Sequence, residues 1–315
     1  MKVLITGGAG FIGSHLADGF IERGDQVAIF DRARQLHEFR SIYIAGDLMD
    51  REAVASAVRK SDVVIHAGGI LGTHETVSNA EETARVNIVG SLNVIDAVTR
   101  YGNRLVSISK PNVWLNPYSI TKDSVEKFCF MYVNECGTNI AIVKLYNVYG
   151  TRQKYSQVRK AMPTWIVAAL SGRPVEIFGT GTATVDLVHT EDVKNGVIAI
   201  VDNFESCRVQ RCDGIAADIY SGFPIFNKQV LELGSGQDIS VNESVEALRE
   251  ALGISFEVRR LPMRRGEVDG TKLCADISRA TSLTGFRPKV FLQEGLTETI
   301  AYYKERLPQM VAGML

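Results

Sequence analysis

Short apolar runs alternate with stretches whose apolar residues recur three and four positions apart through the first half of the chain. Residues 2–6 are an apolar run typical of a buried strand, and a helical repeat follows from Phe11 to Arg23. A second apolar run then ends at Asp31. The same alternation predicts further strands at residues 41–45, 61–66, 104–108 and 139–145, and helices at 78–101 and from Pro117 onward. This order predicts an α/β fold with a doubly wound parallel sheet, the Rossmann arrangement.

The first strand and the first helix are joined by a glycine-rich turn that contains Gly7, Gly10 and Gly13. Residues without a Cβ let the backbone turn tightly and approach a pyrophosphate, whose charge then lies at the free N–H groups of the helix N-terminus. Asp31 follows about twenty residues later, as in dinucleotide-binding folds. Its carboxylate can accept hydrogen bonds from the adenine-ribose hydroxyls but would repel a 2′-phosphate, so the sequence predicts NAD rather than NADP. Arg32 and Arg34 are close enough to soften this preference.

The pattern changes after about residue 150. We expect an NAD-binding domain in residues 1–150, with a return segment at about 186–235, and a smaller C-terminal α/β substrate lobe mainly in 151–315. Residues 203–228, rich in turn formers, look like an insertion for which the sequence indicates no function. Within the lobe the sequence predicts a helix at 163–171, a strand at 175–178, a capping box formed by Ser240 and Glu243, and two packing helices between 275 and 302.

Tyr118 and Lys122 are the strongest candidates for chemistry. Pro117 is a plausible first helical residue, so both side chains lie in the first turns of one helix, four residues apart and on one face. An ammonium beside a phenol favours the phenolate, and the helix N-terminus acts in the same direction. The sequence therefore predicts a Tyr118 pKa lowered towards neutrality and a tyrosine that works as a general base.

Composition excludes several other classes of protein. The chain has 315 residues, 45% of them apolar, and 35 Lys+Arg balance 36 Asp+Glu, so we expect neither nucleic acid nor an anionic membrane as a partner. No apolar run is long enough to span a bilayer, and the chain enters a strand directly, so we expect no signal peptide and a cytoplasmic protein. Five cysteines suit a reducing compartment. The close pair Cys207 and Cys212 lacks the spacing of a zinc site, so free thiols and no metal are predicted.

Gly-x-x-Gly-x-x-Gly after Thr6, together with Tyr-x-x-x-Lys, resembles the extended short-chain dehydrogenase/reductase family, and within it the nucleotide-sugar epimerases and dehydratases. The resemblance runs from residue 1 to about 305. It implies that Asp47 and Leu48 contact the adenine, that Asn87 braces the active-site strand, and that Lys122 also holds the nicotinamide ribose. Small residues at 67–69 would let the fourth strand approach the cofactor, whereas His66 is expected to be structural. The cofactor-binding positions that we predict in addition to Gly7, Gly10, Gly13, Tyr118 and Lys122 are Phe11, Ile12, Asp31, Arg32, Asp47, Leu48, Ala67, Gly68, Gly69, Asn87, Ser107, Leu145 and Val148.

The chain departs from the family just after the fifth strand. Aligned on Val113-Trp114, the position of the family's catalytic Ser or Thr holds Lys110, with Ser109 before it, and the connection to Tyr118 is short. A charged lysine can donate a hydrogen bond and stabilise negative charge on the sugar oxygen. It can also partly replace the diphosphate-binding cation that is missing at Val185. The alternative is a solvent-facing lysine, with Ser109 or Ser107 supplying the hydroxyl. The candidate catalytic residues are therefore Tyr118, Lys122, Ser109 and Lys110.

Two residues are candidates for the substrate diphosphate. Asn147 lies in a segment that matches Arg-x-Phe-Asn-Val-Tyr-Gly, with Lys144 in place of the Arg, and Arg264 begins a stretch similar to Arg-Pro-Gly-Asp. The resemblance implies that both bind the diphosphate; for Arg264 the alternative is a solvated basic turn. Val185 stands where the family carries another Arg, so one diphosphate-binding cation is missing.

The resemblance implies an NAD-dependent enzyme that transiently oxidises a hydroxyl of a nucleotide-activated sugar, with epimerisation as the first interpretation. A dehydratase or a net reductase is the alternative within the family, and a binding protein with weakened catalysis is the alternative outside it. A homodimer is expected through the helices near 78–101 and 118–136, because the second is apolar on more than one face.

Overall fold

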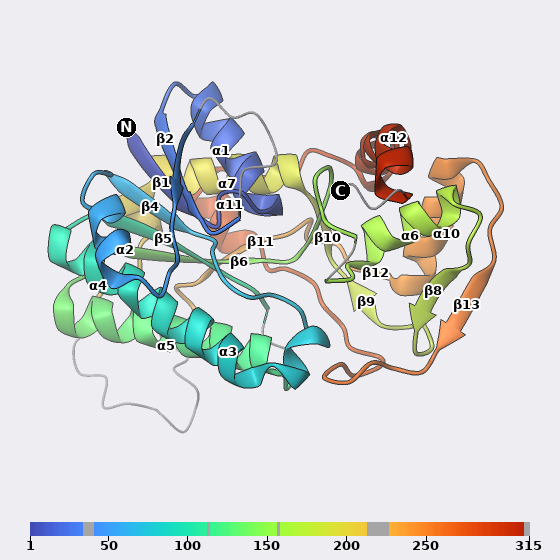
Figure 1. Cartoon of the computed structure of the whole chain (residues 1–315), viewed down its shortest axis with the longest axis horizontal. Coiled ribbons are helices and arrows are strands. Elements are labelled where there is room, and N and C mark those ends of the chain that lie inside the picture. The colour runs from blue at the N-terminus through green and yellow to red at the C-terminus, as the bar shows by residue number, and fades with distance from the viewer. Residues whose placement is uncertain (34–40, 112–113, 156–157, 213–226, 312–315) are drawn as a thin grey trace.

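Seven parallel strands form the central sheet, in the order β11-β6-β5-β4-β1-β2-β3. The structure is a computed structural model that describes residues 1–33, 41–111, 114–155, 158–212 and 227–311 (Figure 1). The strands are β1 (Lys2–Thr6), β2 (Gln26–Asp31), β3 (Ile42–Ala45), β4 (Val63–His66), β5 (Arg104–Ser109), β6 (Ile140–Leu145) and β11 (Leu231–Leu233). Every strand predicted in the first half is present, with ends that differ by at most two residues. The doubly wound parallel sheet is therefore confirmed.

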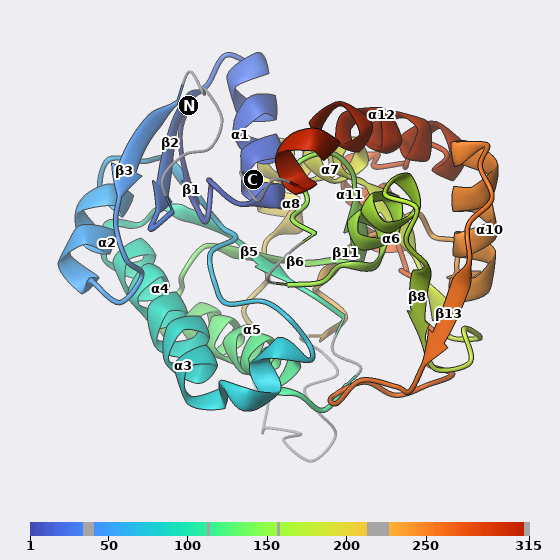
Figure 2. The same cartoon turned by 45° about the vertical axis from the view of Figure 1, so that its right-hand side comes forward.

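Helices cover both faces of the sheet (Figures 1 and 2). One face carries α1 (Phe11–Glu22), α7 (Thr190–Asp202), α8 (Phe204–Cys207) and α11 (Ser278–Thr284), and the other carries α2 (Arg51–Val58), α4 (Gly90–Tyr101) and α5 (Pro117–Cys136). Strand residues alternate between the two cores: Val3 and Ile5 pack against Leu16 of α1, whereas Leu4 packs in the core that contains Val94 and Val125. A strand with both faces buried explains the continuous apolar runs of the sequence.

The predicted helix at 78–101 is interrupted. A short 3₁₀ helix, η1 (Glu75–Ser78), precedes α3 (Ala80–Ala84), and a π-helical turn, η2 (Arg85–Val89), joins α3 to α4. Single π turns inside α-helices frequently occur at functional sites. Here the turn contains Asn87, one of the predicted cofactor-site residues.

A smaller lobe lies to one side of the sheet (Figure 2). It contains α6 (Ala161–Leu170), α10 (Val241–Leu252) and α12 (Leu292–Val311), which share a core with the parallel pair β8 (Val175–Phe178) and β13 (Val258–Leu261). Two further pairs of strands lie among the described residues. They are β7 (Asn147–Tyr149) with β10 (Leu187–His189), and β9 (Thr184–Val185) with β12 (Ile239–Ser240). The predicted capping box of Ser240 and Glu243 is present at the start of α10.

Asp186 connects the lobe to the sheet. Its side chain is fully buried, and one carboxylate oxygen accepts from the backbone N–H (2.6 Å) and the hydroxyl (2.8 Å) of Ser235. The other oxygen accepts from the N–H groups of Gly236 and Ala275, both at 3.0 Å. One carboxylate therefore holds three segments that are distant in the sequence.

The expected insertion at 203–228 lies partly outside the described residues. Its first part forms α8, and Val209 then donates its N–H to Ile140 O at 2.8 Å beside β6. All five cysteines are free, as predicted. Within the ranges that the structure describes, no helix is both long and apolar enough to cross a membrane.

Candidate active site

The glycine-rich turn brings β1, α1 and β4 together. Gly7 has φ +70°, and a Cβ on it would lie 2.6 Å from the Cα of Gly68; a Cβ on Gly13 would lie 2.3 Å from Gly7 O. Gly10 is the N-cap of α1 and offers no side chain to the N–H groups of the first turn, which contains no acidic residue. These N–H groups are thus free to bind a pyrophosphate, as the sequence predicts. The geometry fits a dinucleotide.

Asp31 lies beside this turn at the end of β2. Its Oδ2 accepts from the N–H of Ala9 (3.0 Å) and its Oδ1 from the N–H of Ala33 (2.9 Å), which fixes the carboxylate at the edge of the predicted ribose site. Arg32 is exposed and forms a 3.5 Å ion pair with Asp47. This pair draws the guanidinium of Arg32 towards another acid, so it does not neutralise Asp31. Arg34 lies outside the described residues.

The end of β4 is organised by two hydrogen-bond networks. His66 hydrogen-bonds with Thr6 Oγ1 (2.7 Å) and Ser91 Oγ (2.8 Å), and burial lowers its pKa to about 3. It is a neutral structural residue, as expected. Asn87 accepts from the N–H of Ile70 (2.7 Å) and donates to Ile70 O (2.9 Å) and Thr121 Oγ1 (3.0 Å). Asn87 therefore braces the segment after Gly69 against α5.

Tyr118 and Lys122 occupy the first turns of α5, as predicted. Asn116 caps this helix by accepting from the N–H of Ser119 at 3.0 Å, and Pro117 is its first residue. Lys122 is buried, and its Nζ donates to Ile108 O at 3.0 Å.

In the protein chain alone the pKa of Tyr118 is raised rather than lowered, so this prediction is wrong. Burial raises the pKa of the Tyr118 phenol to about 12, and burial lowers the pKa of Lys122 to about 8, an effect that Glu126 partly opposes. Desolvation is the largest cause of both pKa shifts. A phenolate at Tyr118 therefore requires further positive charge in the assembled site.

Ser109 is directed away from Tyr118. Its hydroxyl donates to the carboxylate of Glu126, which is buried and pairs with Lys144 at 3.2 Å. Burial raises the pKa of Glu126, whereas Lys144 and Ser109 lower it. The sequence interpretation missed Glu126, although its spacing from Lys122 repeats that between Tyr118 and Lys122 along one helix face. Ser107 is buried and contacts the thiol of Cys129, so it too faces α5.

Lys110 is not a solvent-facing lysine, and this alternative is wrong. Its Nζ donates to Ser119 Oγ at 2.8 Å and lies 5.4 Å from the centre of the Tyr118 ring. Burial lowers the pKa of Lys110 to about 8, and the charges of Lys160 and Lys122 act in the same direction. A cation is therefore present beside the predicted base.

The other wall of the site comes from the smaller lobe. Arg264 is partly buried, forms a two-pronged salt bridge with Glu267, and stacks over the Phe178 ring at 4.7 Å. Glu267 also accepts from Thr73 Oγ1 at 2.6 Å. Arg264 is thus held in an ordered turn, contrary to the alternative of a solvated basic turn.

This turn contacts the catalytic helix directly. Asn116 Nδ2 donates to Gly266 O at 3.0 Å, and a Cβ on Gly266 would lie 3.0 Å from Val77 and 3.1 Å from the Cβ of Asn116. On the sheet side, Asn147 begins β7 with a buried Nδ2 that has no hydrogen-bond partner within the part of the chain that the structure describes. Among those same residues no group of three or more His, Cys, Asp or Glu side chains could hold a metal ion.

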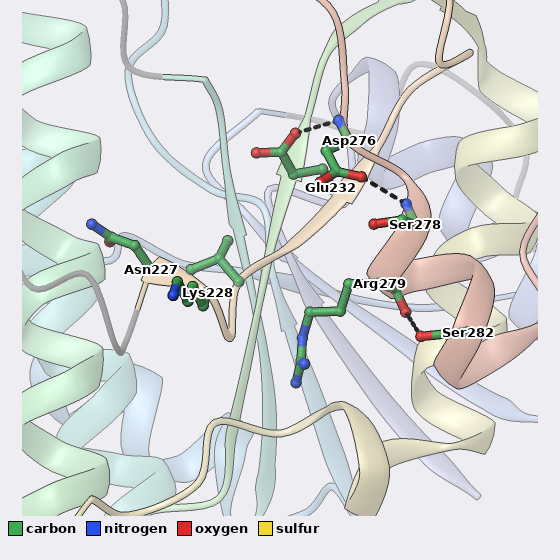
Figure 3. A pocket seen from close by; sticks show the side chains of 8 residues that line it. Asn227, Lys228, Glu232, Asp276, Ser278, Arg279 and Ser282 are labelled. Carbon is green, nitrogen blue, oxygen red and sulfur yellow. Dashed lines mark hydrogen bonds between the residues drawn. The ribbon is translucent and has the colours of Figure 1, made fainter.

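A separate pocket of about 510 Å³ lies at β11 and α11 and contains none of the predicted site residues (Figure 3). Its lining residues include Glu232, which accepts from the N–H of Asp276 (2.8 Å), and Asp276, which accepts from the N–H of Ser278 (3.0 Å). The pocket is therefore distinct from the candidate active site.

The parallel sheet, the glycine turn and the Tyr118–Lys122 helix define a dinucleotide-dependent enzyme of the short-chain dehydrogenase/reductase type. The model of the NAD dependent epimerase/dehydratase family matches residues 3–211, more than half of the chain, so the chain belongs to this family. The cofactor is NAD, and the resemblance to nucleotide-sugar epimerases and dehydratases is confirmed.

Similar proteins modify UDP-sugars. The chain is 25% identical to the UDP-N-acetyl-alpha-D-glucosaminuronate decarboxylase of Bacillus cytotoxicus, over 96% of this chain and 98% of that protein. It is 27% identical to the UDP-glucose 4-epimerase of Mycolicibacterium smegmatis, over 97% and 99%. Among solved structures, the UDP-glucose 4-epimerase of Thermotoga maritima with UDP-glucose superposes with a TM-score of 0.86 and 26% identity, covering 98% of this chain and all of the other.

Proposed function

We propose that this enzyme is an epimerase that inverts a hydroxyl-bearing carbon of a UDP-sugar. The observation that carries the proposal is the placement of Tyr118 and Lys122 one turn apart on α5, with Lys110 beside Tyr118. The N-cap residue of this helix, Asn116, contacts the 264–267 turn of the smaller lobe. Relatives named for UDP-sugars support the nucleotide, because both an epimerase and a decarboxylase match over nearly the whole chain.

Each residue has a role in this proposal. Tyr118 takes the proton of the sugar hydroxyl and returns it, and Lys122 stabilises the phenolate and holds the nicotinamide ribose. NAD supplies the acceptor and donor of the hydride. Asn147 offers a buried amide without a partner as a donor to the diphosphate. Arg264 is the second anchor, and its salt bridge to Glu267 must open or share the guanidinium for it to bind a phosphate.

The cofactor is held by the residues of the glycine turn and of the strand ends. Phe11 and Ile12 present the first N–H groups of α1, and Asp31 receives the ribose. Leu48 is buried against the Gly68 and Gly90 backbone, where it forms one wall of the adenine site. The residues from Ala67 to Gly69, at the end of β4, continue this wall.

A dehydratase and a net reductase use the same residues, so the products decide between them. We would incubate the purified protein with a panel of UDP-sugars, identify products by proton NMR, and follow reduced-nicotinamide absorbance. An epimerase yields an inverted sugar with no net change in absorbance. A new deoxy-keto sugar would indicate a dehydratase, and stoichiometric cofactor consumption a reductase. The absence of any product with every UDP-sugar would refute the proposal in favour of a binding protein.

We also propose that the protein is a homodimer through the helices near 78–101, which are α3, η2 and α4, and through α5. Val89 of η2 is 43% exposed, and Ile120 and Met131 of α5 are 49% and 41% exposed, although Val125 and Val133 of α5 are buried. Exposed apolar residues on adjoining helices suit a helical interface between two copies. A sedimentation experiment that gives the monomer mass at micromolar concentration would refute it.

The division of labour between the two lobes is part of the same proposal. Residues 1–150 with the return segment at 186–235 bind NAD, and 151–315 mainly bind the sugar nucleotide. We also propose a cytoplasmic location; the five free cysteines support it, because free thiols persist in a reducing compartment.

A further inference from the structure

Two lysines in the candidate active site have no acidic partner of their own. Lys110 Nζ is bonded only to the neutral hydroxyl of Ser119, and neither Lys110 nor Lys160 forms an ion pair with any residue that the structure describes. Of the acids nearby, Glu126 pairs with Lys144 and Glu267 pairs with Arg264, while Glu75 accepts from the backbone N–H of Arg159. Partly buried ammonium groups without a counter-ion are costly, so an anion is missing from this arrangement.

Lys160 belongs to the same part of the site although it comes from another segment. It is the N-cap residue of α6, and its neighbour Arg159 donates its N–H to Glu75 of η1 at 3.1 Å. Burial lowers the pKa of Lys160, and Glu75, Arg264 and Glu267 are the charged groups that act on it. The bond between Arg159 and Glu75 places the backbone next to Lys160 beside η1, and the charge of Lys160 also lowers the pKa of Lys110.

The position of Lys110 indicates which part of the substrate carries the missing charge. Its Nζ lies over the ring of Tyr118, the proposed proton acceptor, and bonds to the residue that follows it. A group that contacts this ammonium lies at the reacting sugar, whereas Asn147 and Arg264 are placed to receive the diphosphate. The sequence of the connection before Tyr118, residues 111–117, contains no acidic residue that could neutralise the charge of Lys110.

We propose that the substrate sugar is itself anionic, a UDP-hexuronate, and that Lys110 and Lys160 hold its carboxylate. The inference rests on the proposed function and narrows it to one class of sugar. Lys110 then takes the place of the family's hydroxyl because it selects the charged sugar. The substrate diphosphate is the other anion that these lysines could bind. Every UDP ligand carries the diphosphate, whereas only a UDP-hexuronate carries the carboxylate, so a comparison of UDP ligands separates the two cases.

Binding measurements on the NAD-loaded protein test this directly. Isothermal titration with UDP, UDP-glucose and UDP-glucuronate compares ligands that share the diphosphate and differ at the sugar. We expect the parent to bind UDP-glucuronate at least about tenfold more tightly than UDP-glucose. Lys110→Met and Lys160→Met should each lose about tenfold in affinity for UDP-glucuronate and less than about twofold for the other two ligands. Lys110→Arg should keep the preference for UDP-glucuronate. The matched control is Lys154→Met, because Lys154 is an exposed lysine six residues before Lys160.

Each other result overturns the inference in a recognisable way. Equal weakening of all three ligands in the Met variants would assign the lysines to the diphosphate, and no change would make them bystanders. A parent that binds UDP-glucose as tightly as UDP-glucuronate would refute the anionic sugar while leaving the epimerase proposal intact. Failure of every UDP ligand to bind to NAD-loaded parent protein would refute the proposed function and this inference together.

Discussion

Replacing Lys122 by methionine should make the protein more stable at neutral pH while removing its activity. Burial lowers the pKa of Lys122 from 10.5 to about 8, and at 1.4 kcal/mol per pKa unit the charge costs about 3 kcal/mol of folding free energy. Methionine fills the same space without the charge but leaves Ile108 O without its donor, which costs about 1–2 kcal/mol. The net expectation is a gain of about 1–2 kcal/mol at pH 7.

The pH dependence distinguishes this explanation from simple repacking. Below about pH 8 Lys122 is protonated in both the folded and the unfolded chain, so the full cost is present. Between about 8 and 10.5 the folded chain releases the proton first, the unfolded state binds more protons, and the stability of the parent rises with pH. The methionine variant lacks this rise. Its advantage should therefore shrink by about 2–3 kcal/mol between pH 7 and pH 10 and change sign.

Urea unfolding of nucleotide-free parent and variant at both pH values measures the effect, because bound NAD would add its own stabilisation. Lys127→Met is the matched control: Lys127 is exposed on the same helix and pairs with Asp123. This control should show no comparable pH-dependent difference. A Lys122→Met protein that is less stable than the parent by the same amount at pH 7 and pH 10 would refute the reasoning.

Three further predictions follow from the same contacts. Tyr118→Phe should lower turnover by about 10²–10⁴-fold and leave NADH binding, read by fluorescence titration, nearly unchanged; undiminished turnover would exclude Tyr118 as the base. NADH should bind more tightly than NADPH because of Asp31, and Asp31→Asn should narrow the difference; tighter NADPH binding by the parent would contradict this. Asp186→Asn should lower the free energy of unfolding by about 3 kcal/mol, since an amide presents one acceptor and one donor to four donors, and an unchanged thermal midpoint would show that the carboxylate is dispensable.

The sequence predicts the sheet and the cofactor turn well because both are local. Each strand is a contiguous apolar run, and the Gly7–Gly13 turn depends on residues that neighbour one another in the chain. The start of α5 is equally local, since Asn116 and Pro117 specify the cap and the first turn. The π-helical turn at Arg85–Val89 has no such signal, because it depends on the tertiary contacts of Asn87.

The electrostatics of the site could not be predicted in this way. Ser109 and Glu126 are separated by 17 residues, and their hydrogen bond depends on how α5 lies against β5. The lysine at position 110 was visible in the sequence, but its bond to Ser119 and its place over Tyr118 required the structure. The prediction of a lowered Tyr118 pKa was wrong for the same reason. Spacing along a helix indicates a neighbouring charge but not the burial of the phenol, which raises its pKa.

The buried carboxylate of Asp186 has a consequence for the synthesis of the chain. Its donors lie 49, 50 and 89 residues further along, so the emerging polypeptide carries an incompletely bonded anion while at least 89 more residues are synthesised. The final donor, the N–H of Ala275, is synthesised 89 residues after Asp186. The carboxylate can therefore be fully hydrogen-bonded only after the segment that contains Ala275 has been synthesised. During that interval its unburied apolar surface is a substrate for chaperones.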